Sequence, residues 1–166
     1  MARSSPEIRD VMDSIRSIVH VLRTAGRNSE QLHGLTAAQL FVLQTIGDAP
    51  GVSVNGLAEL THTDQSSVSV VVQKLVDKKL VERSYSPTDR RRAALALLPA
   101  ATAVLKRTPD SPQQRLISAI SSLSNTDLKA LARLLGQVVK SSDATDGPPP
   151  LFFEERVKPT RRRTAK

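Results

Sequence analysis

Residues 53–92 constrain the fold more than any other part of the chain. Ser53 precedes an expected helix over residues 54–60, three residues follow, and Asp64 precedes a second helix that runs to about residue 79. Serine and aspartate oxygens accept hydrogen bonds from the free amides of a first helical turn, so both residues suit the cap position. The stretch therefore predicts a helix, a tight turn, a second helix and then a hairpin.

The second of these helices has two chemically different faces. Apolar residues recur at spacings of three and four, which predicts a buried face made of Val68, Val71, Val72, Leu75 and Val76. The opposite face is short, polar and able to donate and accept hydrogen bonds, and it consists of Gln65, Ser66, Ser69, Gln73 and Lys74. An isolated helix with such a face is usually just solvated there. Next to a basic hairpin, the same face suits the major groove of DNA.

The hairpin follows at once. Residues 81–86 and 93–98 are strand candidates, with Val81 and Tyr85 on one face of the first strand, and Leu95 and Leu97 on the same side of the second. The turn between them is Pro87-Thr88-Asp89, and the tip carries three consecutive arginines, namely Arg90, Arg91 and Arg92. Three guanidinium groups on one loop repel one another unless an anion is near, and DNA phosphates or a narrow minor groove supply that anion.

This stretch resembles the MarR (multiple-antibiotic-resistance repressor) family of winged helix-turn-helix regulators. The resemblance covers roughly residues 35–98 and rests on Leu35-Thr36-Ala37-Ala38-Gln39-Leu40, Leu57-Ala58-Glu59, Ser67-Val68-Ser69, Lys74-Leu75, Leu80-Val81-Glu82-Arg83 and Asp89-Arg90-Arg91. It implies that Arg91 enters the minor groove and that Asp89 orients it. Two positions depart from the family pattern: Val70 stands where a basic residue is usual, and Lys79 where a glycine is usual, at a helix end with positive φ.

Helical patterns flank this stretch on both sides. An amphipathic helix is expected from about residue 6 to 25 with Gly26 as its stop, and another begins at Thr36, where Gln39 can close a capping box, and runs to about residue 46. A short helix over residues 100–107 follows the hairpin.

The resembled family has a long unbroken helix after the hairpin, whereas prolines interrupt the pattern here. An interior proline costs about 3 kcal/mol in a helix, so we expect a break over residues 108–110. Helices should restart at Ser111, with Gln114 closing a second capping box, and at Ser124, the latter running to about residue 140.

The predicted fold is mainly α with a small β-hairpin wing, that is, a winged helix-turn-helix plus a helical dimerisation lobe. The winged lobe covers residues 35–98, the dimerisation lobe residues 1–34 and 99–140, and a linker with a basic tail residues 141–166. The long apolar stripe of the N-terminal helix can pack on its own core or on a partner. We expect it to serve dimerisation together with the later helices, through Ile8, Val11, Met12, Ile15, Leu116, Ile120, Leu131 and Leu135.

The C-terminal stretch has two parts of open function. Leu151-Phe152-Phe153 is expected to dock on the core or on a second subunit, since adjacent phenylalanines are unfavourable in water; the alternative is an apolar patch in a loose tail. Basic residues crowd the last eleven positions, at Arg156, Lys158, Arg161, Arg162, Arg163 and Lys166. This tail either lies along DNA phosphates or merely solubilises the chain.

Composition narrows the function further. The net charge of +8 favours an anionic partner, and the absence of cysteine excludes disulfides, thiolate zinc sites and cysteine redox sensing. No apolar run is long enough to cross a membrane and no signal peptide is recognisable, so we expect a cytoplasmic protein.

His20, His33 and His62 have no carboxylate at ligand spacing, so no metal site is expected. Neither cofactor nor catalytic motifs are present, which argues against an enzyme.

The sequence therefore predicts a homodimeric, sequence-specific regulator of transcription that binds double-stranded DNA and represses. The family resemblance adds a small-molecule effector that relieves repression. DNA contacts are assigned to Gln65, Ser66, Ser67, Ser69, Gln73, Lys74, Asp89, Arg90, Arg91 and Arg92.

Two alternatives remain open. One is a sequence-tolerant, nucleoid-type DNA-binding protein, which Val70 and the basic tail favour. The other is a winged-helix protein-interaction module, against which the arginine-rich wing argues.

Overall fold

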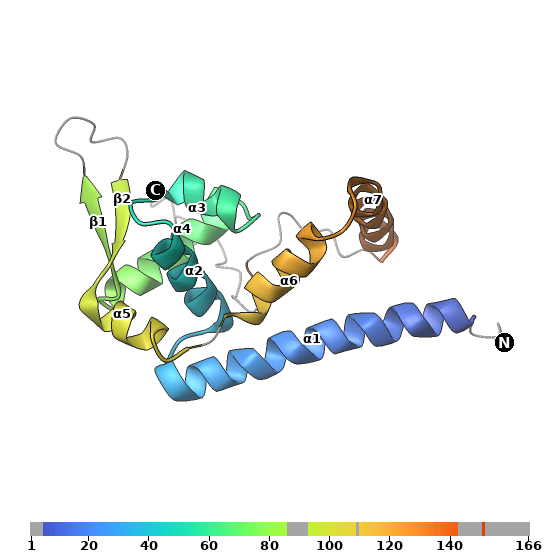
Figure 1. Ribbon diagram of the computed structural model, residues 1–166, viewed down its shortest axis with the longest axis horizontal. Coiled ribbons are helices and arrows are strands. Elements are labelled where there is room, and N and C mark those ends of the chain that lie inside the picture. Colours follow the sequence, from blue (N-terminus) through green and yellow to red (C-terminus); the bar gives the residue numbers. More distant parts are fainter. Residues whose placement is uncertain (1–4, 86–92, 109, 143–150, 152–166) are drawn as a thin grey trace, which may run out of the picture.

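The computed structural model describes residues 5–85, 93–108, 110–142 and 151. Within this part the chain is mainly α-helical with one two-stranded antiparallel sheet, as the sequence predicted (Figure 1). The elements are α1 (Pro6–His33), α2 (Ala37–Asp48), α3 (Val54–Leu60), α4 (Gln65–Asp77), β1 (Val81–Tyr85), β2 (Ala93–Leu97), α5 (Pro99–Leu105), α6 (Pro112–Ser121) and α7 (Asn125–Ser141).

One hydrophobic core holds α2, α3, α4 and the hairpin together. Its fully buried side chains come from every one of these elements and include Val42, Leu43, Ile46, Leu57, Val68, Val71, Val72, Leu75, Val81 and Leu95. In Figure 1 these elements form one compact group, and α1 runs along its edge. Leu151 is also buried in this core, which agrees with the predicted docking of the C-terminal stretch; Phe152 and Phe153 lie outside the described residues.

The wing is held by more than its own two strands. Val81 pairs with Leu97 and Arg83 with Leu95, so the expected apolar side of the hairpin faces one way. The segment before α3 adds a third partner, because the amide of Leu95 donates to the Val52 carbonyl (2.9 Å) and the Leu95 carbonyl accepts from the Gly51 amide (3.1 Å). This pairing, which was not predicted from the sequence, ties the wing to the start of α3. The helix-turn-helix of α3 and α4 and the wing together form the reading head.

The prediction that the N-terminal helix stops at Gly26 is wrong. α1 continues to His33 and ends at Gly34, which adopts a left-handed conformation with φ of 63°. Gly26 is instead buried inside the helix, where a Cβ would lie 3.5 Å from that of Ala37. A Cβ at that distance makes an ordinary van der Waals contact, so the packing does not require glycine here, and the backbone stop is eight residues later.

Of the two capping boxes predicted from the sequence, one is confirmed and one is wrong. At α2 the Thr36–Gln39 capping box forms in full. At α6, Ser111 caps the helix by accepting from the Gln114 amide at 3.2 Å, but the reciprocal half is absent. The Gln114 side chain instead donates to Asp48 of α2 at 3.1 Å, while the Ser111 amide donates to Gln44 Oε1 at 3.0 Å. The polar groups of this helix start therefore attach it to α2.

The helix break after the wing is confirmed, and α7 lies apart from the core. α5 and α6 are separate helices, with Pro112 in the first turn of α6. α7 buries none of its residues, and Figure 1 shows it together with the N-terminal half of α1 extending away from the α2–α4 group. Among the described residues no helix has the length and apolarity that a membrane crossing requires.

α4 ends in a left-handed turn that carries a lysine. Lys79 has φ of 56°, and its amide donates to the Val76 carbonyl at 2.9 Å, while the Leu80 amide donates to the Leu75 carbonyl at 3.0 Å. These two bonds form a Schellman motif, with buried Leu80 and Leu75 as its apolar contact. Lys79 occupies the position that normally takes glycine, because a Cβ is strained there.

Replacing Lys79 by glycine should therefore stabilise the protein. We expect Lys79→Gly to raise the free energy of unfolding by about 1 kcal/mol, measured by denaturant unfolding at fixed protein concentration. Lys79→Ala is the matched control, since it removes the charge but keeps the Cβ, and it should give no gain. Equal effects of the two substitutions would show that backbone strain at this position is not the cause.

Candidate nucleic-acid interface

A short turn fixes α3 against α4. Ser53 caps α3 by accepting from the Gly56 amide at 3.1 Å, as predicted. At the other end, the buried Thr61 hydroxyl donates to the Leu57 carbonyl at 2.8 Å, and the Thr63 amide donates to the Ala58 carbonyl at 3.0 Å. The backbone hydrogen bonds of the turn are thus satisfied locally, which sets the angle between the two helices without side chains from elsewhere.

α4 has the two faces that the sequence predicted. Val68, Val71, Val72 and Leu75 are fully buried, and Val76 packs against the core. On the other side Gln65, Ser66 and Gln73 are exposed, whereas Ser67, Ser69 and Lys74 are half-buried. All six side chains assigned to the groove therefore belong to one helix whose inner face is held rigidly by the core. Val70 is also half-buried, among these polar neighbours.

Asp64 is bound tightly at the N-terminus of α4. Its carboxylate accepts from the hydroxyl of Ser66, from the hydroxyl of Ser67 at 2.7 Å and from the Ser67 amide at 3.0 Å. The hydrogen bond from Ser66, followed by those from Ser67, lowers the pKa of Asp64 from 3.8 to about 2. The carboxylate is therefore ionised throughout the neutral range and also lies favourably at the positive end of the helix dipole.

The Asp64 cap determines whether Ser66 and Ser67 can donate or accept hydrogen bonds at a DNA base. The hydroxyl protons of Ser66 and Ser67 are both directed at Asp64. Their oxygens keep free lone pairs, so in this arrangement the two serines present acceptors rather than donors. Acceptors at this end of the helix match the amino groups of adenine or cytosine in the major groove.

One polar partner on the outer face was missed by the sequence analysis. The amide nitrogen of Gln73 donates to Asp77 Oδ1 at 2.9 Å, one helical turn further on. The i, i+4 spacing of glutamine and aspartate was the available signal. Asp77 holds the Gln73 amide in one orientation, which leaves its carbonyl oxygen and second N–H for a base edge.

The wing tip lies outside the described residues. The predicted DNA contacts of the three arginines, with Arg91 in the minor groove and Asp89 orienting it, therefore stay predictions, and so does the position of these residues relative to α4. The strands that lead to them are described, and β1 begins directly after the left-handed turn that ends α4. In the described part of the chain, no group of three or more histidine, aspartate or glutamate side chains is placed to hold a metal ion.

Comparison with known proteins decides the family. The profile of the MarR family matches residues 33–92, which contain the capped start of α2, the helix-turn-helix and most of the wing. A proposed transcriptional regulatory protein for the hcr operon of Thauera aromatica is 30% identical over 130 residues, which is 78% of each chain. The chain belongs to the MarR family. It is a transcriptional regulator and not an enzyme, as predicted.

Solved structures of other MarR-type regulators share the fold. BpsR of Bordetella bronchiseptica has a TM-score of 0.53 at 26% identity, and the match covers 78% of this chain and 98% of BpsR. The S. aureus MepR–DNA complex has a TM-score of 0.52 at 22% identity, covering 77% of this chain and 94% of MepR. This MarR-family chain therefore has the winged helix-turn-helix and helical lobes of its relatives.

The Asp64 cap should be visible in the stability of the protein. Asp64→Ala should lower the free energy of unfolding by about 1 kcal/mol at neutral pH. The pKa of Asp64 is lower in the folded protein than its ordinary 3.8, so the part of this stabilisation that depends on ionisation is present above about pH 4 and is lost as the pH falls toward 2. The gap between wild type and Asp64→Ala, measured by denaturant unfolding, should shrink between pH 6 and pH 3. Asp64→Asn retains a cap without a titrating charge, so its stability relative to Asp64→Ala should not change over this range.

Proposed function

We propose that this MarR-family regulator is a cytoplasmic homodimeric repressor that binds a near-palindromic site in double-stranded DNA. Each protomer places α4 in a major groove and the wing in the adjacent minor groove. The two α4 helices then lie about one helical turn apart on the duplex, roughly 34–36 Å. A dimer bound across a promoter excludes the transcription machinery, which accounts for repression.

The observation that carries this proposal is the exposed polar face of α4. A helix whose inner face is fully buried cannot rotate, so its outer side chains keep a fixed direction. Those side chains are short and nearly free of acid between Gln65 and Lys74. The MepR relative has been solved bound to DNA. A protein-interaction module does not need this face or an arginine-rich wing.

Homodimerisation is supported by apolar surface that the protomer leaves uncovered. In α1 the side chains of Ile8, Val11, Met12 and Ile15 are between 37% and 57% exposed. In α7, apolar side chains are exposed along one helix, among them Leu134, Leu135, Val138 and Val139. Of the other residues assigned to the interface, Leu116, Ile120 and Leu131 are half-buried. Apolar side chains exposed in a row along a helix mark a protein interface in a folded chain.

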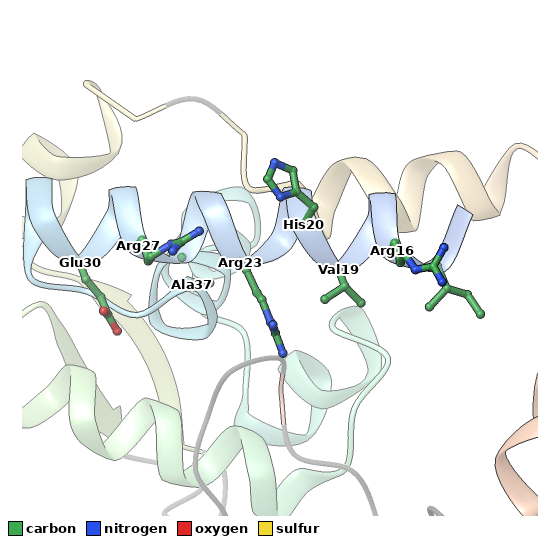
Figure 2. Close-up of a pocket in the computed structure, with 9 residues that line it drawn as sticks. Arg16, Val19, His20, Arg23, Arg27, Glu30 and Ala37 are labelled. Atoms are coloured by element: carbon green, nitrogen blue, oxygen red, sulfur yellow. The ribbon is translucent and has the colours of Figure 1, made fainter. Parts of the chain in front are cut away.

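The charges of α1 favour a second, antiparallel copy as the partner. Its first nine described residues carry three acidic side chains against one arginine, while the remainder of the helix carries three arginines against one glutamate. Two antiparallel α1 helices thus bring opposite charges together. The basic half borders a hollow of about 650 Å³ (Figure 2), into which Arg23 extends and to which the apolar Ile15 and Val19 also contribute. We assign this hollow to the dimer interface.

A second cavity supports relief by a small-molecule effector. It measures about 280 Å³ and lies between α1, α2 and the connection from α5 to α6. Arg107 and Arg115 line it together with Asp110, and the hydrogen bond between His33 and Thr108 (3.1 Å) crosses the same junction. A small anionic ligand here contacts both lobes at once. DNA binding by the BpsR relative is regulated by 6-hydroxynicotinic acid.

Arg91 is the decisive residue of the wing in this proposal. Arg91→Ala should weaken binding to a selected operator by about 1–3 kcal/mol, because it removes a specific minor-groove contact. The measurement is fluorescence anisotropy at physiological salt, on the operator and on a random duplex.

The matched control for this measurement is Arg133→Ala, which removes an exposed arginine from α7 and should leave affinity unchanged. An affinity for random duplex equal to that for the operator would instead favour the nucleoid-type alternative.

The interface on α1 is tested by placing a charge in its apolar stripe. Ile15→Asp should convert the dimer into monomers in sedimentation-velocity experiments, because the carboxylate loses its hydration in the interface. Ser14→Asp places the same charge beside the stripe, on an exposed position that faces elsewhere, and should leave the dimer intact. A wild-type protein that sediments as a monomer at micromolar concentration would refute the dimer itself.

A further inference from the structure

Val70 lies on the outward face of α4 and is half-buried there. Residues 66, 70, 73 and 77 follow one another at spacings of four, three and four, so their side chains share one face of the helix. Ser66, Gln73 and Asp77 on this line are polar and exposed. Val70 is the apolar residue among them, directly opposite the face that packs on the core.

The core does not account for this valine. In the described part of the chain, the hydrophobic cluster and the partly buried side chains packed against it include Val68, Val71, Val72 and Val76 of α4, but not Val70. Helix propensity does not account for it either, since a β-branched residue loses side-chain freedom in a helix and forms helices less readily than alanine. Valine at this position is therefore explained neither by the hydrophobic core nor by helix propensity.

The chemistry of the major groove suggests what the side chain is for. Valine offers two methyl groups and no hydrogen-bonding atom, so it would leave a polar base edge unsatisfied if it displaced water from it. In the major groove the C5-methyl of thymine is the one apolar group on a base edge. We propose that Val70 contacts a thymine methyl and makes the protein prefer thymine at one position in each half-site.

This inference rests on the proposed function, because it requires α4 to lie in the major groove. It also gives the departure from the family pattern a physical meaning. A basic residue at position 70 would attract phosphate or the guanine edge, whereas valine exchanges that electrostatic contact for shape and apolarity. The outer line of α4 then presents, in order, an acceptor, an apolar group and an oriented amide.

Removing the thymine methyl tests the contact directly. The probe is a duplex selected from a random library by the wild-type protein, in which each thymine is replaced in turn by deoxyuridine. Wild-type affinity should fall about three- to five-fold at one thymine per half-site, as expected for one buried methyl group. Val70→Ala removes the contact in both half-sites of the dimer, so it should bind the unmodified duplex about nine- to twenty-five-fold more weakly and show no further loss at that deoxyuridine.

Val21→Ala is the matched control, since it makes the same change at an exposed valine of α1, away from the reading head. It should keep both the affinity and the full deoxyuridine effect. The proposal is overturned if no deoxyuridine position weakens wild-type binding, or if Val70→Ala retains the wild-type sensitivity. The deoxyuridine series uses only wild-type protein, so it stands whatever the stability of the variant. Failure to select any preferred duplex would refute the proposed function, which is a separate outcome.

Discussion

Burial of one face of α4 is the constraint on which the rest of the structure depends. Its four innermost side chains are fully buried against α2, α3 and the hairpin, and each would cost about 1.5–3 kcal/mol to expose. That burial fixes the rotation of α4 about its axis, and with it the direction of every outward side chain. The polar face is therefore useful for recognition because the apolar face cannot move.

Polar contacts join apolar ones where the reading head meets the outer helices, among them the packing of Leu105 and Ile117 against the core. The start of α6 is attached to α2 by hydrogen bonds from Ser111 to Gln44 and from Gln114 to Asp48, and His33 meets Thr108 across the same junction. Bonds of this kind contribute about 0.5–1.5 kcal/mol each, far less than the core. Under the proposed function, these hydrogen bonds are the contacts that a ligand bound at the junction would rearrange while the core of the reading head stays intact.

The local features were largely predictable from the sequence, whereas features set by distant contacts were not. The caps at Thr36, Ser53 and Asp64 depend on neighbours within three residues, so the sequence indicated them directly. Gly26 gave a wrong helix end because a single glycine inside a helix weakens it without ending it, and the left-handed turn forms at Gly34 instead. The capping box predicted at Gln114 does not form because its side chain donates to Asp48, which is 66 residues away in the sequence. No short-range sequence pattern indicates the pairing of Val52 with β2. The wing arginines remain predictions from sequence.

The residues that hold α4 in place differ from some of the residues on its outward face. Asp64 closes one end, the left-handed turn at Lys79 closes the other, and the core holds the inner face. Ser69 and Val70 do not contribute to any of these three supports. Substitutions at these two positions therefore leave the two helix ends and the buried face in place. Under the proposed function, preference for new operators can evolve among descendants of this chain by single outward substitutions, while the scaffold that presents them stays the same.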